Sequence, residues 1–164
     1  MNAEAFYPYS LYSGEFIDAS LPPLQLVVSD IENQCDVVVN LWGYLIWSSR
    51  LRGVLATLTS DPIQYLSAIV RDLAGRESET YMLANPLVQV DAVDEERSSL
   101  LYNPDGHIEG INALTLKEES IGERSLFRLS SVPADVIVRE NVAKGIVQSG
   151  CTGSSFTPIT EYKV

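Results

Sequence analysis

The sequence predicts an α+β fold: a single strand-rich domain in which two main short helices pack on a mostly antiparallel sheet. The length of 164 residues is typical of one domain, and 46% hydrophobic residues is ordinary for a globular protein. Short apolar runs bounded by proline, glycine and asparagine predict strands, whereas two stretches repeat apolar residues at helical spacing. We therefore expect one domain over residues 1–164, with a less regular segment at 1–40.

The first helix is predicted directly after an apolar strand end, Leu45–Trp47. Ser48 or Ser49 is suited to the N-cap position, because a serine oxygen accepts a free backbone N–H of the first turn. Pro62 ends the helix, and Ile63–Val70 is predicted as the next strand. One face of the helix carries four apolar residues at i, i+3, i+4 and i+7: Leu51, Val54, Leu55 and Leu58.

A similar unit occurs near the C-terminus. Val136–Val138 is again a short apolar strand, and Gly150 and Gly153 are predicted to end the helix that follows it. Extended structure resumes at Phe156–Ile159. The buried face of this second helix is predicted to consist of Val142, Ile146 and Val147.

The two units predict a strand–helix–strand pseudo-repeat over about residues 45–70 and 136–159. One constant offset aligns Leu45 with Val136 and Tyr65 with Phe156. Few residues are identical, so the alternative is two similar helices packed on one sheet.

The rest of the chain predicts strands joined by tight turns. Asn103–Gly106 has proline and glycine where a β-turn needs them, so it separates Leu100–Tyr102 from His107–Leu116. The second strand changes its alternation at Gly110-Ile111, which predicts a bulge. Further strands are predicted at Leu24–Val28 and Ser125–Leu129. Tyr81–Leu83 and Leu87–Val90 are predicted to form either a strand pair or one strand bent at Asn85-Pro86.

Negative charge is concentrated in two parts of the chain. The 11 Lys+Arg and 22 Asp+Glu give a formal net charge of -11. Residues 1–49 are net −6 and residues 77–123 are net −9, whereas residues 50–76 and 124–164 are each net +2. A negative surface repels phosphate, so the composition argues against direct nucleic-acid binding and favours a basic protein partner.

No motif predicts catalysis, a metal site or a cofactor. The single histidine, His107, directly follows a surface turn, where we expect it in solvent. Cys35 and Cys151 lie far apart without a C-x-x-C pairing, which favours free thiols that pack as small apolar side chains over a disulfide between them. The acids of residues 91–96 lack the glycine and spacing of a calcium loop, and phosphate-binding glycine motifs are absent.

Aromatic residues fall into two groups. Three of them precede the first helix and are predicted to pack in or beside the core: Trp42, Tyr44 and Trp47. Three others belong to the N-terminal segment, where partial exposure would favour a contact surface: Tyr7, Tyr9 and Tyr12.

No segment predicts export or membrane insertion. Residues 1–20 contain no Lys or Arg and no continuous apolar stretch, unlike a secretory signal. The longest apolar run, near Leu41–Trp47, is too short to span a bilayer. We expect a cytoplasmic protein that does not bind membranes.

Several short motifs have a recognisable arrangement. In the C-terminal part they are SLFRL at Ser125–Leu129, VIVRE at Val136–Glu140, and G-x-x-G-x-x-F-x-P within Gly150–Pro158. In the middle they are YMLANP at Tyr81–Pro86 and VDAVD at Val90–Asp94. Together these motifs resemble a family of bacterial polymorphic-toxin immunity proteins, over roughly residues 45–160.

Two positions depart from the family pattern. Arg139 stands where the family often has serine, and Ser154-Ser155 stand where a branched residue is commoner. Within the motifs, Phe127 and Phe156 look like apolar anchors and Asn85 looks like a turn residue. The motifs therefore resemble those of a family without identifying an interface.

The resemblance implies a cytoplasmic antidote that binds a secreted toxin domain and blocks its active site or its access to substrate. This makes the chain a binding protein rather than an enzyme. Two alternatives remain: an enzyme that protects by modifying the toxin or its target, and a scaffold or adaptor subunit of a secretion system. The genes that adjoin this one would separate the adaptor from the antidote.

Charge suggests where a toxin would bind. Toxins aimed at nucleic acid, such as nucleases, need basic clefts, which acidic side chains can occupy as phosphate mimics. The alternative is that the acidity is ordinary for a soluble bacterial protein. The candidate toxin contacts are the acids of the N-terminal segment and, above all, Asp91, Asp94, Glu95, Glu96, Glu118 and Glu119.

Overall fold

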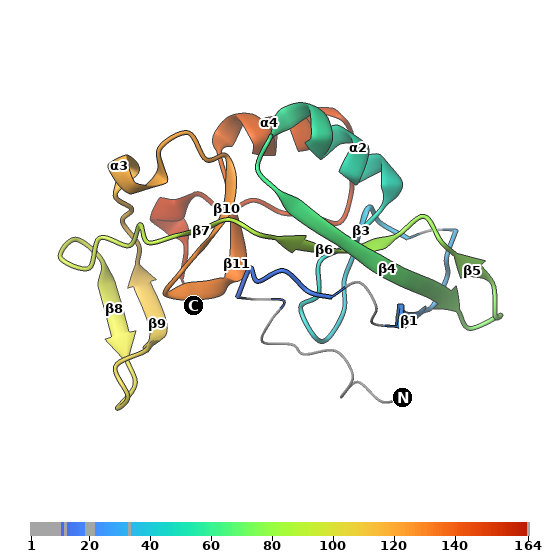
Figure 1. The fold of residues 1–164 in the computed structure, drawn as a ribbon, viewed down its shortest axis with the longest axis horizontal. Helices are drawn as coiled ribbons and strands as arrows, with labels where there is room; N and C mark the ends of the chain where they lie inside the picture. The colour runs from blue at the N-terminus through green and yellow to red at the C-terminus, as the bar shows by residue number, and fades with distance from the viewer. Residues whose placement is uncertain (1–10, 12, 19–21, 33, 164) are drawn as a thin grey trace.

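The structure, a computed structural model, describes residues 11, 13–18, 22–32 and 34–163. In this part of the chain, strands and two longer helices form an α+β, strand-rich domain, as the sequence predicts. The helices α2 (Ser49–Leu58) and α4 (Glu140–Gln148) lie side by side over the strands, and a hairpin projects at one end (Figure 1). Among the described residues, none of the helices has the length and apolar character needed to cross a membrane.

The largest sheet is built around β4, the longest strand. Its order is β1-β4-β6-β3-β2, and β5 pairs with β4 beside this path. Alternate residues of β4 are buried, as expected for a strand with one face on the core. Among the described strands of this sheet, only β1 and β4 pair in parallel. The strands are β1 (Leu24–Val28), β2 (Val37–Val38), β3 (Ile46–Trp47), β4 (Ile63–Asp72), β5 (Glu77–Ser78) and β6 (Met82–Pro86).

One extended stretch, Met82–Val90, connects this sheet to a second one. Its first part is β6, and its last two residues form β7 (Gln89–Val90), which pairs in parallel with β10 (Leu126–Leu129). The predicted alternative of one bent strand is therefore closer to the structure than a pair of strands. β10 also pairs with β11 (Val132–Val138), while β8 (Ser99–Tyr102) and β9 (Ile108–Ala113) form a separate hairpin.

Each of the two longer helices buries one apolar face. Ser48 caps α2, because its Oγ accepts the N–H of Leu51 at 3.1 Å. Leu51 and Leu55 pack in one cluster with Val142 and Ile146 of α4. Two shorter helical segments are present as well: α3 (Glu118–Ile121) and the 3₁₀ helix η2 (Ile159–Glu161).

Asp61 connects the loop after α2 to the beginning of β10. Its side chain is 5% exposed, and Oδ2 accepts the backbone N–H groups of Ser125 at 2.7 Å and Leu126 at 2.9 Å. Thr59 donates its hydroxyl at 3.1 Å, and Arg124 forms a salt bridge at 3.2 Å. Burial alone would raise the pKa of Asp61, but these hydrogen bonds outweigh burial and hold the pKa below its ordinary value.

Asp36 makes a corresponding connection between β2 and the segment after α4. It accepts the hydroxyl of Ser48 at 2.6 Å and the backbone N–H of Thr152 at 2.9 Å. Burial would raise the pKa of Asp36, yet the hydrogen bonds from Ser48 and Thr152 and the charge of Arg50 lower it. Ser48 therefore caps α2 and donates to Asp36 at the same time.

Two buried amides hold the N-terminal segment on the sheet. Asn85 donates to the carbonyl of Glu15 at 2.8 Å. Gln64 accepts the N–H of Ile17 at 3.0 Å and donates to the carbonyl of Ile17 at 2.6 Å. Asn85 is fully buried inside β6, so the prediction of a turn asparagine is wrong, although its role is structural.

The predicted pseudo-repeat is confirmed for the first strand and the helix of each unit. The second strand is present in the first unit, as β4, but not in the second unit. The pair β3 and α2 is repeated as β11 and α4, and Gly150 ends α4 with φ of 70°. Residues 154–158 are irregular and η2 follows, so the strand predicted at Phe156–Ile159 is wrong. Phe156 is 38% exposed rather than an apolar anchor, because it lies in this irregular surface segment. Val147 is exposed too, since it lies about 100° around the helix from Ile146.

Other predictions are confirmed or corrected by tertiary contacts. Both cysteines are free and half-buried. The hairpin register shifts at positions that flank Gly110-Ile111, in agreement with the predicted bulge. Tyr44 and Trp47 are buried, but Trp42 is exposed. No sequence pattern predicted β2, β5 or α3. Tyr7, Tyr9 and Tyr12 lie outside the described residues.

Gly153 should tolerate no side chain. Its φ is 84°, and an added Cβ would lie 2.5 Å from the carbonyl oxygen of Val37 and 2.6 Å from Cβ of Cys35. Gly75 has a similar φ of 82° but no atom within 4 Å of that position, which makes Gly75→Ala a matched control. We expect Gly153→Ala to lower the free energy of unfolding by about 3 kcal/mol and Gly75→Ala by about 1 kcal/mol in urea titrations. Equal losses would show that the contact with β2 is not tight.

Asp61 should make stability depend on pH. Because its pKa is lower in the folded chain than the unfolded value of about 3.9, its contribution is complete above that pH and is lost as the pH falls through the folded pKa. Asp61→Asn should lower stability at neutral pH and flatten the loss of stability on acidification below about pH 4. Urea unfolding across this range measures both effects, with the exposed Asp105→Asn as control. A steep acid loss that persists in Asp61→Asn would contradict this role.

Candidate protein-binding site

Two distant segments carry the six predicted contact residues, and backbone contacts hold these segments together. Ala92 accepts the N–H of Lys117 at 2.8 Å, and Val93 forms an isolated antiparallel bridge with Leu116. The acids of residues 91–96 therefore lie next to those that begin α3. We name this surface the acidic end: Asp91, Asp94, Glu95, Glu96, Glu118 and Glu119.

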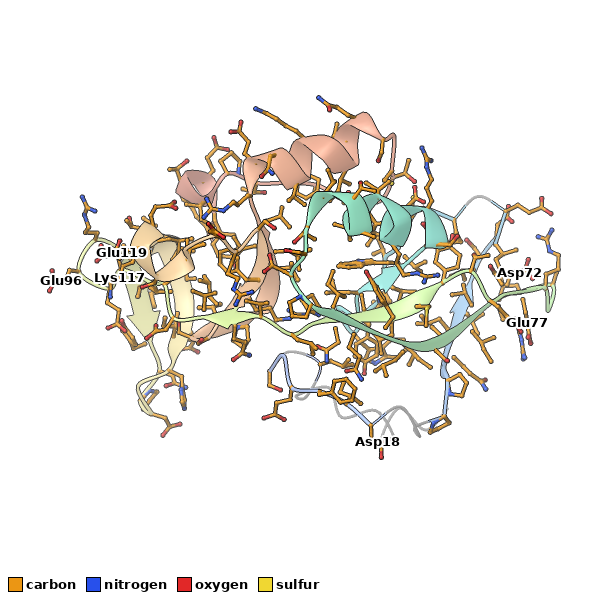
Figure 2. All side chains as sticks on the ribbon, turned by 45° about the horizontal axis from the view of Figure 1, so that its top comes forward. Asp18, Asp72, Glu77, Glu96, Lys117 and Glu119 are labelled. Carbon is orange, nitrogen blue, oxygen red and sulfur yellow. The ribbon has the colours of Figure 1, made fainter. Side chains whose placement is uncertain are left out.

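The charges of the acidic end are only partly balanced. Arg97 lies 3.9 Å from Asp94, and Arg139 lies 3.9 Å from Glu118, both at the long limit for an ion pair. Lys117 lies at the same end of the molecule as Glu96 and Glu119 and reduces the negative charge there (Figure 2). Within the described residues, four carboxylates of this surface form no salt bridge: Asp91, Glu95, Glu96 and Glu119.

Carboxylates at the opposite end bind arginines of the same chain. Arg76 pairs with Asp72 at 2.7 Å and with Asp30 at 3.3 Å, and it also pairs with Glu32. Asp72 and Glu77 lie far from the acidic end (Figure 2). Burial would raise the pKa of Asp72, but its hydrogen bonds with Arg76 lower it. The acids of the N-terminal segment that the sequence also suggested as contacts are thus partly committed to holding the fold.

An open hollow of about 520 Å³ lies between the end of the Met82–Val90 stretch and α3. One wall is formed by Pro62 and residues 87–91, and the other by Ser120, Ile121 and Arg124. Asp91 belongs both to this hollow and to the acidic end. Sequence patterns did not predict the hollow, because it depends on long-range pairing. β4 begins at Ile63, which pairs with Pro86, so β4 does not pair with the residues after Pro86.

The loop between β2 and β3 exposes apolar side chains. Leu41 is 98% exposed, and Val39 is almost as exposed. Asn40 holds the loop by accepting the N–H groups of Trp42 at 3.2 Å and Tyr44 at 3.0 Å. Trp42 stacks on Tyr44 with ring centroids 6.1 Å apart but remains partly in solvent, in contrast to the prediction of core packing.

The histidine and the two cysteines of the chain differ in their surroundings, and the segments that carry Cys35 and Cys151 are in contact, since Asp36 accepts the N–H of Thr152 at 2.9 Å. His107 is exposed in the turn of the β8–β9 hairpin, and Cys35 and Cys151 are free thiols. In the described ranges, no group of three or more His, Cys, Asp or Glu is arranged to hold a metal ion. The described surface includes acidic side chains, an exposed apolar loop and a hollow, which are features used in protein recognition.

The fold and these surfaces define a strand-rich α+β domain with an acidic surface at one end. The chain matches the model of the Immunity protein family (Imm11) over residues 13–161, and it belongs to that family. The match confirms the resemblance of the motifs and extends it toward the N-terminus, to residue 13. Membership indicates an immunity protein, a class that binds a cognate toxin. No curated protein matches the chain.

Proposed function

We propose that this chain neutralises a secreted bacterial toxin domain in the cytoplasm, by binding it and blocking its active site or its access to substrate. The observation that carries the proposal is the acidic end, where Asp91, Glu95, Glu96 and Glu119 have no salt bridge within the described residues. Carboxylates without a counter-ion in their own chain are available to lysine and arginine of a partner. In this proposal protection requires a complex and no chemical step.

The charge of the acidic end favours a toxin with a basic cleft, such as a nuclease. Such a cleft binds phosphate, and carboxylates that lie close together also present negative charge to it. Complementary charge steers association, with rates up to about 10⁸–10⁹ M⁻¹s⁻¹ at low salt. Exposed charges are screened beyond about 8 Å at physiological ionic strength, so added salt should slow this association.

Neutralising the acidic end should slow association. The variant Glu96→Gln/Glu119→Gln removes two carboxylates that form no salt bridge, and we expect its association rate with the purified toxin domain to fall about fivefold at low salt. The control Glu77→Gln/Glu79→Gln makes the same change in net charge in the segment at the opposite end, where Glu77 is marked in Figure 2. Stopped-flow association at low and high salt measures the difference.

At high salt, the rates of the two double variants should converge, because screening removes the steering. The electrostatic part of the proposal is wrong if the two variants associate equally fast at low salt. If the wild-type chain forms no complex with the toxin domain, the binding function itself is wrong.

A further inference from the structure

β7 has one edge with which no strand of the described chain pairs, since it is the last strand in the order β11-β10-β7. Toward β10, Val88 accepts the N–H of Arg128 at 2.9 Å, and Val90 accepts the N–H of Ser130 at 3.0 Å. Backbone groups alternate in direction along a strand. The N–H and C=O of Gln89 therefore point away from β10.

The hollow lies along this free edge. β4 covers the same side of the preceding strand only as far as Ile63, which pairs with Pro86. Leu87 then donates its N–H to the carbonyl of Pro62 at 3.0 Å, and from there the edge faces the hollow. Ser120 and neighbouring residues of the α3 segment form the opposite wall, so the edge is open to solvent and bounded on one side.

The side chains beside the edge leave its backbone groups accessible and include carboxylates. In a strand, side chains stand on the two faces rather than in the plane of hydrogen bonding. The side chain of Gln89 donates to the carbonyl of Ser13, which holds it on one face. Asp91 lines the hollow at the end of the edge, and Glu119 precedes the lining residue Ser120 in α3; neither forms a salt bridge in the described chain. Arg124 also lines the hollow, but it is paired with Asp61 at 3.2 Å.

We infer that the edge of β7 receives an extended, basic segment of the toxin domain as an added strand. The backbone of that segment hydrogen-bonds with Gln89, and its basic side chains face Asp91 and Glu119. Strand addition gives affinity through main-chain hydrogen bonds, while side chains beside the edge select the partner. The inference rests on the proposed function and specifies where the toxin binds.

A proline at position 89 tests this inference. The N–H of Gln89 lies outside the β10 ladder, so Gln89→Pro removes no ladder hydrogen bond of this chain, and proline is tolerated in edge strands. Gln89→Ala is the matched control, because it also loses the side-chain contact with Ser13 but keeps the N–H. We expect Gln89→Pro to weaken binding of the purified toxin domain about tenfold and Gln89→Ala by less than about twofold. Equal affinities of the two variants would overturn the inference, provided that thermal unfolding shows both to be folded.

Amide exchange of the wild-type chain provides a test that does not depend on folding of the proline variant. On complex formation the N–H of Gln89 should exchange at least about 100-fold more slowly, because it becomes hydrogen-bonded. Unchanged exchange in a formed complex overturns the strand addition and leaves the proposed function in place. Protection that appears in the free chain and rises with its concentration would assign the edge to a second copy and overturn the inference. If the wild-type chain and the toxin domain form no complex, both the inference and the proposed function are wrong.

Discussion

The carboxylate of Asp61 is the interaction on which the arrangement of the two larger sheets depends. It accepts the backbone N–H of Ser125 at the start of β10, and the next residue, Pro62, accepts the N–H of Leu87. These neighbouring contacts determine where the Met82–Val90 stretch stops pairing with β4. They also position β10 to pair with the end of that stretch. Asp36 joins the N-terminus of α2 to the segment after α4 by the same means. Each carboxylate satisfies donors that are remote in sequence, so its loss would expose several unpaired groups at once.

The distribution of charge on the surface follows from this arrangement. Arginines near β4 and β5 neutralise the carboxylates at one end of the molecule, where Arg76 alone pairs with three of them. At the other end, the contact of residues 92–93 with 116–117 brings together more acidic than basic residues. The acidity that the sequence shows as two long segments is therefore divided differently in space. One set of acids holds the fold together, and the other is available to a partner.

Local patterns predicted the elements whose causes are local. The cap at Ser48 and the turn at Asn103–Gly106 depend on neighbours in sequence, and both are confirmed. The strand Leu24–Val28 is confirmed as well, because its apolar run favours a strand before it pairs with the remote β4. The two-residue strand Val37–Val38 exists only because β3 lies beside it, and the exposure of Phe156 depends on the absence of a strand there. The same distinction applies to the candidate site. The sequence named its acidic residues, but the adjacency of its two segments and the free edge of β7 arise from long-range pairing.

The proposed protection depends on formation of a complex between this immunity protein and its toxin. Titration of the toxin domain's activity with increasing amounts of the chain tests it most directly. We expect activity to fall in proportion to added chain and to reach zero at a fixed stoichiometric ratio, without dependence on incubation time. Complete inactivation by far less than one equivalent, growing with time, would contradict it and show that the chain acts as an enzyme on the toxin.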